Sequence, residues 1–181
     1  MRPFYAFVVA AWLAQSALSA SNARAAVQSA GDSAFLIKSE MALSSTPTEV
    51  YARFVEWGKW WSSDHTYSGS AANLTLKVVP GGCLCEQLPG GGFVQHLVVV
   101  YAAPGKMLRL DGSLGPLMMM GGSTSLLASF KAEGQGTKLV LTLTGNGYEP
   151  QGGLSKLASA YDEVLSGQLQ RFKRYAETGK P

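Results

Sequence analysis

The chain has 181 residues, of which 46% are hydrophobic and 15% are charged, with a formal net charge of +3. The low charge and ample apolar content exclude an intrinsically disordered protein, and the length suits a single domain. Lysine and arginine form no stripe of the kind that displaces counterions from nucleic acid, so no nucleic-acid partner is expected.

The first 25 residues have the pattern of a secretory signal peptide. A basic start at Arg2 precedes an apolar run over 4–18, and Ala23–Ala25 supplies the small residues that a signal peptidase reads. The run of about 15 apolar residues is shorter than the ~20 that span a bilayer, so a retained anchor is the less favoured alternative. We expect residues 1–25 to be removed and the mature protein to be periplasmic or secreted, with no stable membrane span.

Removal of this segment takes away Arg2 and Arg24 and lowers the basic side chains from 15 to 13, against 12 acidic ones, a net charge of +1. Residues 26–33 are small and polar, and we interpret them as a flexible leader. Residues 34–177 contain no repeat and no long linker, and they are expected to form one domain.

The sequence of this domain predicts a strand, a helix, six further strands and a long helix, in that order. Alternating apolar residues indicate a strand over 35–43, and the Ser45-Thr46-Pro47 start favours a helix that Gly58 would end. A final helix over 154–175 carries a single apolar stripe. Between them lie six strand-like runs, separated by glycine-rich and proline-rich turns at hairpin spacing: Leu74–Val79, Cys83–Leu88, Phe93–Tyr101, Met107–Asp111, Ser123–Ala132 and Thr137–Gly145.

Seven strands with one apolar face need a cover, and the terminal helix is the only predicted element long enough to provide it. A twisted antiparallel sheet of this size curls around such a helix. The predicted fold is therefore α+β, a seven-stranded curved antiparallel sheet wrapped around a long C-terminal helix, in the order β-α-(β)6-α. Space left between sheet and helix is where a ligand would bind.

This arrangement resembles the helix-grip fold of START-like, or SRPBCC, domains, which include polyketide cyclases and plant allergens. The local sequence is most similar to the branch named after the activator of the heat-shock chaperone ATPase, at Trp60-Trp61, 81–86, 99–110 and 169–175. The resemblance implies an elongated apolar cavity that binds lipids, polyketides or other hydrophobic molecules, without implying a reaction. An exported domain meets neither cytosolic chaperone nor ATP, so chaperone activation is not expected.

An aromatic segment around Trp60 and Trp61 has two interpretations. It could gate the cavity mouth, or its tryptophans could plug the end of the sheet as core, which is favoured because large aromatic residues form cores by default. Methionines in a loop beside a cavity suit an irregular ligand. The complete set of expected ligand-binding residues is Trp60, Trp61, His65, Tyr67, His96, Leu97, Val99, Met118, Met120, Leu126, Leu157, Tyr161 and Leu165.

His96 lies in the middle of a strand that is largely apolar on both faces, so alternation leaves open which face looks inward. If it faces the cavity, Glu86 on the neighbouring strand could orient it or share a proton, as in a cyclase or isomerase. A structural histidine is the favoured alternative. No nucleophile elbow, phosphate loop or zincin motif occurs, so the enzyme hypothesis depends on this acid–base pair.

Cys83-Leu84-Cys85 places two thiols on one face of a strand, with Cα atoms roughly 6.6 Å apart, near the upper limit for a disulfide. The alternatives are a strained or absent bridge, two buried free cysteines or a thiolate metal site, and buried free cysteines are favoured. Met118–Met120 adds soft ligands for copper, but ligand spacing is missing, so no metal and no cofactor are expected.

The sequence therefore predicts an exported START-like protein that binds a hydrophobic small molecule or lipid in a cavity between sheet and helix. Two alternatives remain open. One is a cavity enzyme that uses His96 and Glu86. The other is an envelope protein-interaction module, which would carry an exposed apolar patch in place of a cavity. The oligomeric state does not follow from the sequence.

Overall fold

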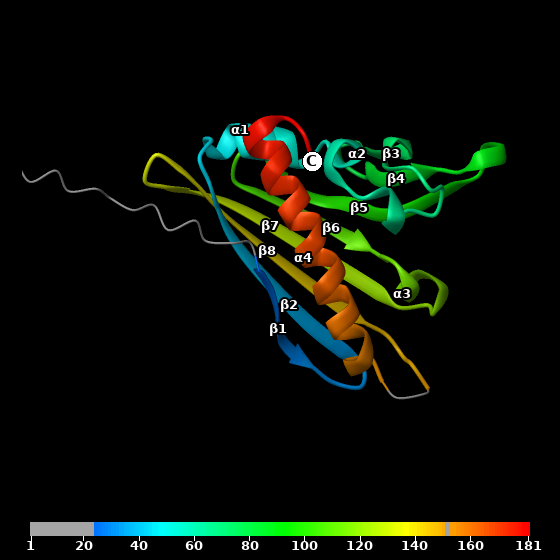
Figure 1. The fold of residues 1–181 in the computed structure, drawn as a ribbon. Coiled ribbons are helices and arrows are strands. Elements are labelled where there is room, and N and C mark those ends of the chain that lie inside the picture. Colours follow the sequence, from blue (N-terminus) through cyan, green and yellow to red (C-terminus); the bar gives the residue numbers. More distant parts are fainter. Residues whose placement is uncertain (1–23, 151–152) are drawn as a thin grey trace, which may run out of the picture.

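The computed structural model describes residues 24–150 and 153–181. One antiparallel sheet curves around the long helix α4 (Ser155–Thr178), which runs diagonally across its inner face (Figure 1). The sheet has eight strands in the order β1-β2-β8-β7-β6-β5-β4-β3. The predicted α+β helix-grip fold is confirmed, with one strand more than the seven expected.

All seven predicted strands are present, and most of them carry the apolar alternation that a sheet with one buried face requires. Every second residue is buried along β2 (Ala34–Leu43), along β8 (Gly136–Asn146) and along most of β7 (Ser123–Glu133). The remaining predicted strands are β3 (Leu74–Leu76), β4 (Cys83–Gln87), β5 (Phe93–Ala103) and β6 (Met107–Gly112).

The eighth strand corrects the prediction of a flexible leader over 26–33. β1 (Arg24–Ala30) pairs antiparallel with β2, from Arg24 opposite Glu40 to Ala30 opposite Phe35. Its residues from Ala26 onward are exposed, so no alternating pattern marks it, and its pairing rests on backbone hydrogen bonds to an open sheet edge. The predicted signal peptide over 1–25 lies outside the described residues except for the first two residues of β1.

The first predicted helix is divided into two. α1 (Pro47–Phe54) begins at a capping box, in which the Thr46 hydroxyl accepts from the Glu49 N–H and the Glu49 carboxylate accepts from the Thr46 N–H. The chain leaves helical geometry at Glu56 and resumes as α2 (Trp57–Trp60). The other helical elements are the 3-10 turns η1 (Ser63–His65), η2 (Ala71–Asn73) and η3 (Pro89–Gly91), and α3 (Pro116–Met119).

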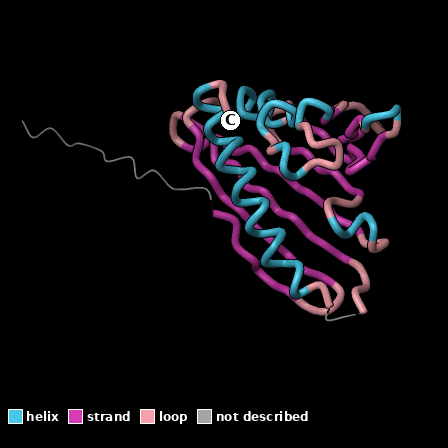
Figure 2. Tube along the Cα trace, turned by 45° about the vertical axis from the view of Figure 1, so that its right-hand side comes forward, coloured by secondary structure: helices cyan, strands magenta, loops and turns pink. Residues whose placement is uncertain are grey.

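An aromatic cluster fills one end of the space between the sheet and α4. Phe54, Trp60 and Phe172 have ring centroids 5.2 to 5.6 Å apart, and the Trp60 indole N–H donates to the Phe54 carbonyl at 3.1 Å. The strands lie on one side and the helices on the other, as Figure 2 shows. The cluster therefore packs the C-terminal half of α4 against the sheet, while the N-terminal half borders the cavity described below.

Among the helices in the described ranges, none combines the length and the hydropathy needed to cross a bilayer.

Candidate functional site

A cavity of about 500 Å³ lies between α4 and the inner face of the sheet. This volume is within the range of roughly 300–1,000 Å³ that is typical of small-molecule sites. Its wall on the sheet side comes from five strands, β3, β4, β5, β7 and β8, and its wall on the helix side comes from α4. The apolar lining side chains of these elements are Leu74, Leu84, Leu126, Leu143, Leu157, Ala160, Val164 and Leu165.

The exposed residues of the cavity lining mark its mouth. His65 and Tyr67 come from the segment after α2, Pro116 from the start of α3, and Ala160 from α4, and all four are exposed. Three separate parts of the chain therefore meet around the opening.

Two tyrosines hold the loop before α3 at this mouth. The Tyr67 hydroxyl donates to the Gly115 carbonyl at 3.1 Å, and the Tyr161 hydroxyl of α4 donates to the Leu114 carbonyl. Burial raises the pKa of Tyr161 to about 12, so its phenol stays protonated and keeps donating at neutral pH. The loop is thus tied to both sides of the opening.

The segment after α2 is fastened to α4 by two further hydrogen bonds. The Gln168 side chain accepts from the Ser62 N–H at 2.8 Å, and Arg171 Nε donates to the Trp60 carbonyl at 3.0 Å. The Trp61 indole N–H donates to the His65 carbonyl at 2.9 Å, which closes the turn. These contacts fix Trp61 in the cavity wall.

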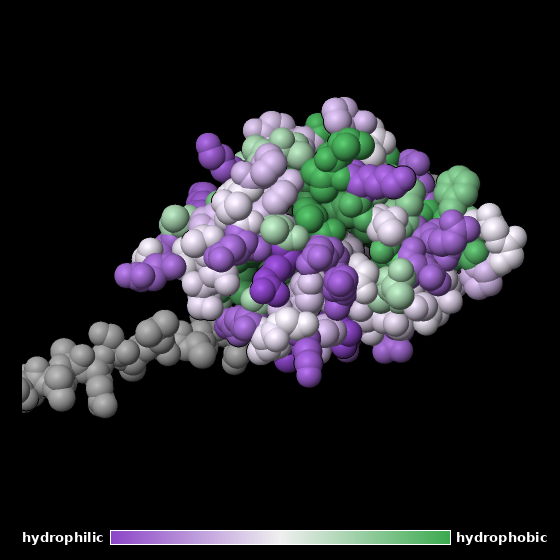
Figure 3. All heavy atoms as spheres, turned by 90° about the horizontal axis from the view of Figure 1, so that it is seen from above, coloured by the Kyte–Doolittle hydropathy of each residue, from purple (hydrophilic) through white to green (hydrophobic). Residues whose placement is uncertain are grey.

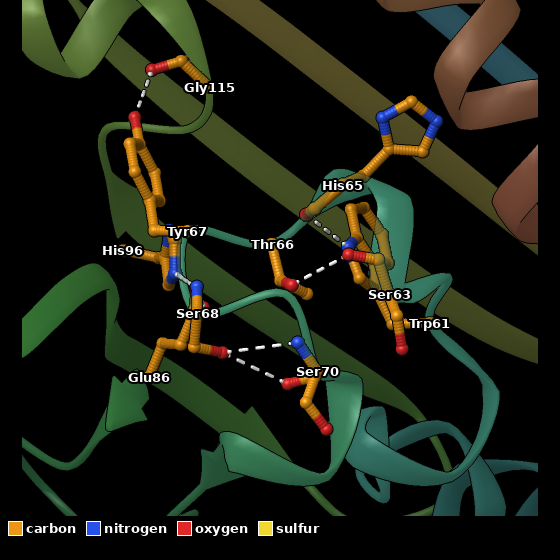
Figure 4. A network of polar contacts seen from close by, with 10 residues as sticks. All are labelled: Trp61, Ser63, His65, Thr66, Tyr67, Ser68, Ser70, Glu86, His96 and Gly115. Carbon is orange, nitrogen blue, oxygen red and sulfur yellow. Dashed lines mark hydrogen bonds and ion pairs between the residues drawn. The ribbon is translucent and has the colours of Figure 1, made fainter. Parts of the chain in front are cut away.

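A buried polar pair from two neighbouring strands lies at the cavity. His96 Nε2 of β5 is 2.9 Å from Glu86 Oε2 of β4, and the two residues are 6% and 1% exposed. The other carboxylate oxygen accepts from the Ser68 N–H. In Figure 4, Tyr67 lies in front of His96, while the His65 ring points away from the pair. His96 lines the cavity; Glu86 stands behind it.

Hydrogen bonding decides the ionisation of Glu86. Burial by itself raises the pKa of this carboxyl, but hydrogen bonds from Ser68, from His96 and from the Tyr67 backbone outweigh burial and hold the pKa below its ordinary value. An ionised carboxylate only accepts hydrogen bonds, so Nε2 of His96 carries the proton between them. Nδ1 of His96 is buried and has no hydrogen-bond partner within the described part of the chain.

A β-bulge explains how His96 comes to face inward. Leu84 pairs with Leu97 and the next residue, Cys85, pairs with Gln95, so His96 is an extra residue in β5. His96 and Leu97 are consecutive and both buried, which breaks the alternation of the strand. The open question about the orientation of His96 is thereby answered, since it lies at the cavity together with Glu86.

Eight of the thirteen expected ligand-binding residues line the cavity, and they come from the aromatic segment, β5, β7 and α4. They are Trp61, His65, Tyr67, His96, Leu126, Leu157, Tyr161 and Leu165.

The other five do not line it. Trp60 belongs to the aromatic cluster, in agreement with the core interpretation and against its assignment as a ligand contact. Leu97 and Val99 are buried in the core at other levels of β5. Met118 and Met120 lie in and directly after α3, away from the cavity lining, because α3 presents the buried Leu117 to the interior in their place.

Several lining residues were not expected from the sequence. Leu74, Leu84, Leu143 and Val164 continue the buried faces of elements that the pattern did predict, so the apolar alternation was a usable signal for them. Trp57 also had a signal, because it continues the apolar spacing of the predicted first helix. Ala160 lies on the exposed side of α4. The others lie in loops, in a 3-10 turn or at the start of α3 and carry no periodic signal: Asp64, Thr66, Leu114, Gly115 and Pro116.

Cys83 and Cys85 form a disulfide, so the favoured prediction of buried free cysteines is wrong. Their Cα atoms are 5.4 Å apart, closer than in a regular strand, in the stretch of β4 that lies opposite the bulge in β5. In the described ranges, no three His, Cys, Asp or Glu side chains gather as a metal site.

The surface also carries exposed apolar side chains. Seen from above, one area of a mostly polar face is hydrophobic (Figure 3). The large exposed hydrophobic residues of the described chain are Val27, Tyr67, Val79, Phe93, Val100, Tyr101, Met119 and Tyr148. The cavity has defined walls and a buried polar pair, so it is the stronger candidate site.

No protein-family model matches the chain, and no curated protein matches it. Solved structures do. CalU16 from Micromonospora echinospora has a TM-score of 0.59 at 13% identity, covering 89% of this chain and 87% of CalU16. The Aha1 dimer from Colwellia psychrerythraea has a TM-score of 0.55 at 16% identity, covering 81% of this chain and 98% of that chain.

A third similar structure is the di-domain ARO/CYC StfQ from the steffimycin biosynthetic pathway, with a TM-score of 0.54 at 16% identity. The match covers 80% of this chain and 51% of StfQ. At such identities the likeness concerns the fold alone. Together with the curved sheet and its long terminal helix, these likenesses show that the chain has a helix-grip fold.

Proposed function

We propose that this protein is exported and binds a hydrophobic small molecule or lipid in the cavity between the sheet and α4. The observation that carries the proposal is the lining, which is mostly aliphatic and aromatic and includes His96, whose Nε2 is bonded to the buried Glu86 behind it. Apolar walls with a few placed polar groups are the usual form of a small-molecule site. The fold shared with StfQ, a di-domain ARO/CYC of a biosynthetic pathway, supports a small-molecule ligand.

The two kinds of lining have different parts in binding. Apolar burial contributes about 25 cal/mol for each Å² removed from water, and it sets the affinity without fixing orientation. A hydrogen bond to His96 fixes which end of the ligand faces β5. A hydroxyl group suits this position, because it can both donate to and accept from an imidazole nitrogen.

Export is supported by the signal-like pattern of residues 1–25 and by the Cys83–Cys85 disulfide, since disulfides persist in oxidising compartments. The intact mass of protein recovered from the periplasm or medium tests it. A mass that begins at Ala26 supports export, and a chain found only in the cytosol with its first 25 residues contradicts it.

Native mass spectrometry of the mature protein, followed by organic extraction, tests the binding proposal. A stoichiometric hydrophobic molecule that is lost on denaturation supports it and identifies the chemical class. Ala160→Trp provides the structural check, because Ala160 is exposed at the mouth of the cavity and an indole there obstructs entry. Ser159→Trp is the matched control, since Ser159 is exposed on α4 but does not line the cavity.

We expect Ala160→Trp to lose the bound molecule and Ser159→Trp to retain it, with both variants folded. Equal retention by the two variants would place the molecule elsewhere and contradict the proposed site. A chain that carries no molecule and binds no hydrophobic probe contradicts the function itself.

The second candidate is a cavity enzyme of the cyclase or isomerase type. The observation that favours it is that His96 lines the cavity with Nε2 bonded to Glu86 and Nδ1 unpartnered in the described chain. Nδ1 can take a proton from a substrate carbon, while the carboxylate of Glu86 stabilises the resulting imidazolium. This requires Nδ1 of His96, a residue that lines the cavity, to come beside the substrate.

Hydrogen–deuterium exchange at the carbon next to the carbonyl of a cyclic ketone, followed by NMR in D₂O, tests this chemistry. Wild-type protein should accelerate the exchange, and His96→Phe should abolish the acceleration while the ketone still binds. Equal losses of binding and exchange would speak against a catalytic role.

A further inference from the structure

We propose that the Cys83–Cys85 disulfide is a positioning element for His96: by shortening β4 it sets the bulge in β5 that brings His96 to Glu86 and to the cavity wall. The proposal joins two features that lie on opposite faces of one strand. It concerns the geometry of the free protein and stands whether or not the cavity holds a ligand.

The inner and outer faces of β4 carry different side chains. Leu84 and Glu86 are buried on the inner face, where Leu84 lines the cavity and Glu86 contacts His96. Cys83 and Cys85 alternate with them and are therefore on the outer face, where both are half-buried. The disulfide thus acts on the inner face through the backbone it constrains.

The constraint is a loss of length. Two residues of extended strand span roughly 6.6 Å, whereas the Cα atoms of Cys83 and Cys85 are 5.4 Å apart. The difference is about a third of the rise of one residue. In the neighbouring strand, the three steps from Gln95 to Val98 lie opposite these two shortened steps, and a bulge takes the extra residue out of the ladder.

The register places the extra residue within the shortened stretch. Cys83 pairs with Val98, Leu84 with Leu97 and Cys85 with Gln95, so the skipped residue is His96. The bulge therefore lies between the two half-cystines, directly opposite the step from Leu84 to Cys85. A bulge turns a side chain away from its regular face, which is how His96 joins Leu97 on the inner side.

β6, which pairs with β5 on the side away from β4, leaves room for this bulge. The His96 carbonyl accepts from the Ser113 N–H at 2.7 Å, just beyond the end of β6. A Cβ at Gly112 would lie 2.3 Å from that carbonyl oxygen, so the absence of a side chain there leaves room for it. β6 leaves room for the bulge, and the shortened stretch of β4 lies directly opposite it.

It follows that the His96 imidazole faces the cavity only while the Cys83–Cys85 disulfide is intact. Without the disulfide, β4 can extend, the ladder with β5 can become regular, and a regular alternation returns His96 and Leu97 to opposite faces. Leu97 is the apolar residue and would keep the inner face. His96 would then leave Glu86.

The double variant Cys83→Ser with Cys85→Ser tests this in the free protein. The chain has two histidines, so imidazole ¹H–¹⁵N spectra report His96 and, as an internal reference, the exposed His65. In wild type, the buried Nε2–H bonded to Glu86 should give a slowly exchanging signal. We expect this signal to disappear in the double variant while the His65 signals stay unchanged. An unaltered His96 signal overturns the proposal.

Thr75→Ala is the matched control, because Thr75 pairs with Cys85 from β3 and is exposed on the same outer face. Thr75→Ala should leave the His96 signal in place.

If the double variant does not fold, wild-type protein reduced with dithiothreitol is measured instead. Each cysteine sulfur gains a hydrogen, and the reagent becomes its cyclic disulfide. The Trp60 indole N–H, bonded inside the core, reports the fold. Loss of the His96 and Trp60 signals together overturns the proposal, because the bridge would then hold the whole fold.

A ligand measurement separates this proposal from the proposed function. Naphthalene and 2-naphthol differ by one hydroxyl group, and one hydrogen bond corresponds to roughly five-fold in affinity. Wild type should prefer 2-naphthol by about that factor, and the double variant should bind both equally. An equal preference in both proteins overturns the positioning role. If wild type binds neither probe, the proposed function fails, and the imidazole signals still decide the positioning role.

Discussion

His96 Nε2 of β5 and Glu86 Oε2 of β4 lie 2.9 Å apart with both side chains almost fully buried. A charged carboxylate in such surroundings is costly unless hydrogen bonds compensate for the lost water. Here Ser68 and His96 supply them from two different elements. The pair therefore joins β4, β5 and the loop before η2, and several measurable consequences follow from it.

Glu86→Ala should destabilise the protein by about 3 kcal/mol, because it leaves the Ser68 N–H and the His96 Nε2–H buried without their acceptor. Urea unfolding followed by tryptophan fluorescence measures the change. Glu40→Ala is the control, since Glu40 forms exposed ion pairs with Lys38 and Lys138. Its loss should cost much less, because exposed ion pairs contribute little to stability. Similar costs for the two variants would show that the buried pair contributes no more than surface pairs.

Stability should depend on pH through Glu86 in the acid range. The pKa of Glu86 is held below its ordinary value of 4.5, so its contribution to folding is complete above that pH. The contribution is lost as the pH falls through the lower pKa of the folded state. The difference in unfolding free energy between wild type and Glu86→Gln should therefore shrink as the pH is lowered from neutral to well below 4.5. A difference that stays constant over this interval would contradict the assignment.

Gly112→Ala should destabilise the protein by about 1–3 kcal/mol, because the new Cβ would lie 2.3 Å from the His96 carbonyl oxygen and 2.9 Å from the Leu97 Cα. The backbone at the bulge must shift to relieve this contact. Gly167→Ala is the matched change in α4, where a Cβ meets no atom within 4 Å. It should stabilise the protein by up to about 1 kcal/mol. Thermal unfolding of both variants should show shifts in opposite directions.

Trp60 and Trp61 are adjacent but should respond differently to truncation. Trp60→Ala empties a buried position in the aromatic cluster and should cost about 3–5 kcal/mol in stability. Trp61→Ala removes a half-buried cavity wall, so it should cost less stability and weaken the binding of a hydrophobic probe. Unfolding and fluorescence titration together test the contrast. A Trp60 variant that keeps its stability, or a Trp61 variant that binds like wild type, would reverse these assignments.

The strands that the sequence predicted are those with one buried face. Alternation of apolar and polar residues is a property of the chain alone, so β2 to β8 could be located before any pairing was known. β1 has no buried face, and its pairing with β2 depends on backbone groups that every residue carries. Its position therefore could not be predicted from side chains.

The residues of the candidate site were likewise predictable where they lie on the apolar face of a predicted element. The apolar stripe of α4 gave Leu157, Tyr161 and Leu165, all of which line the cavity. The opposite outcomes for Trp60 and Trp61 depend on where α2 ends against α4, and no local pattern records that. Met118 and Met120 were wrongly predicted to line the cavity, because α3 directs Leu117 inward.

The sequence by itself determined the element order, the helix-grip architecture and the apolar character of the space beneath α4, because periodicity specifies which faces must be buried. Only the tertiary structure decided that Cys83 and Cys85 are bridged and that His96 turns toward Glu86. Both depend on the register between β4 and β5, where a shift of one residue moves a side chain to the other face of the sheet. Register is a relationship between two strands, so neither strand's own sequence contains it.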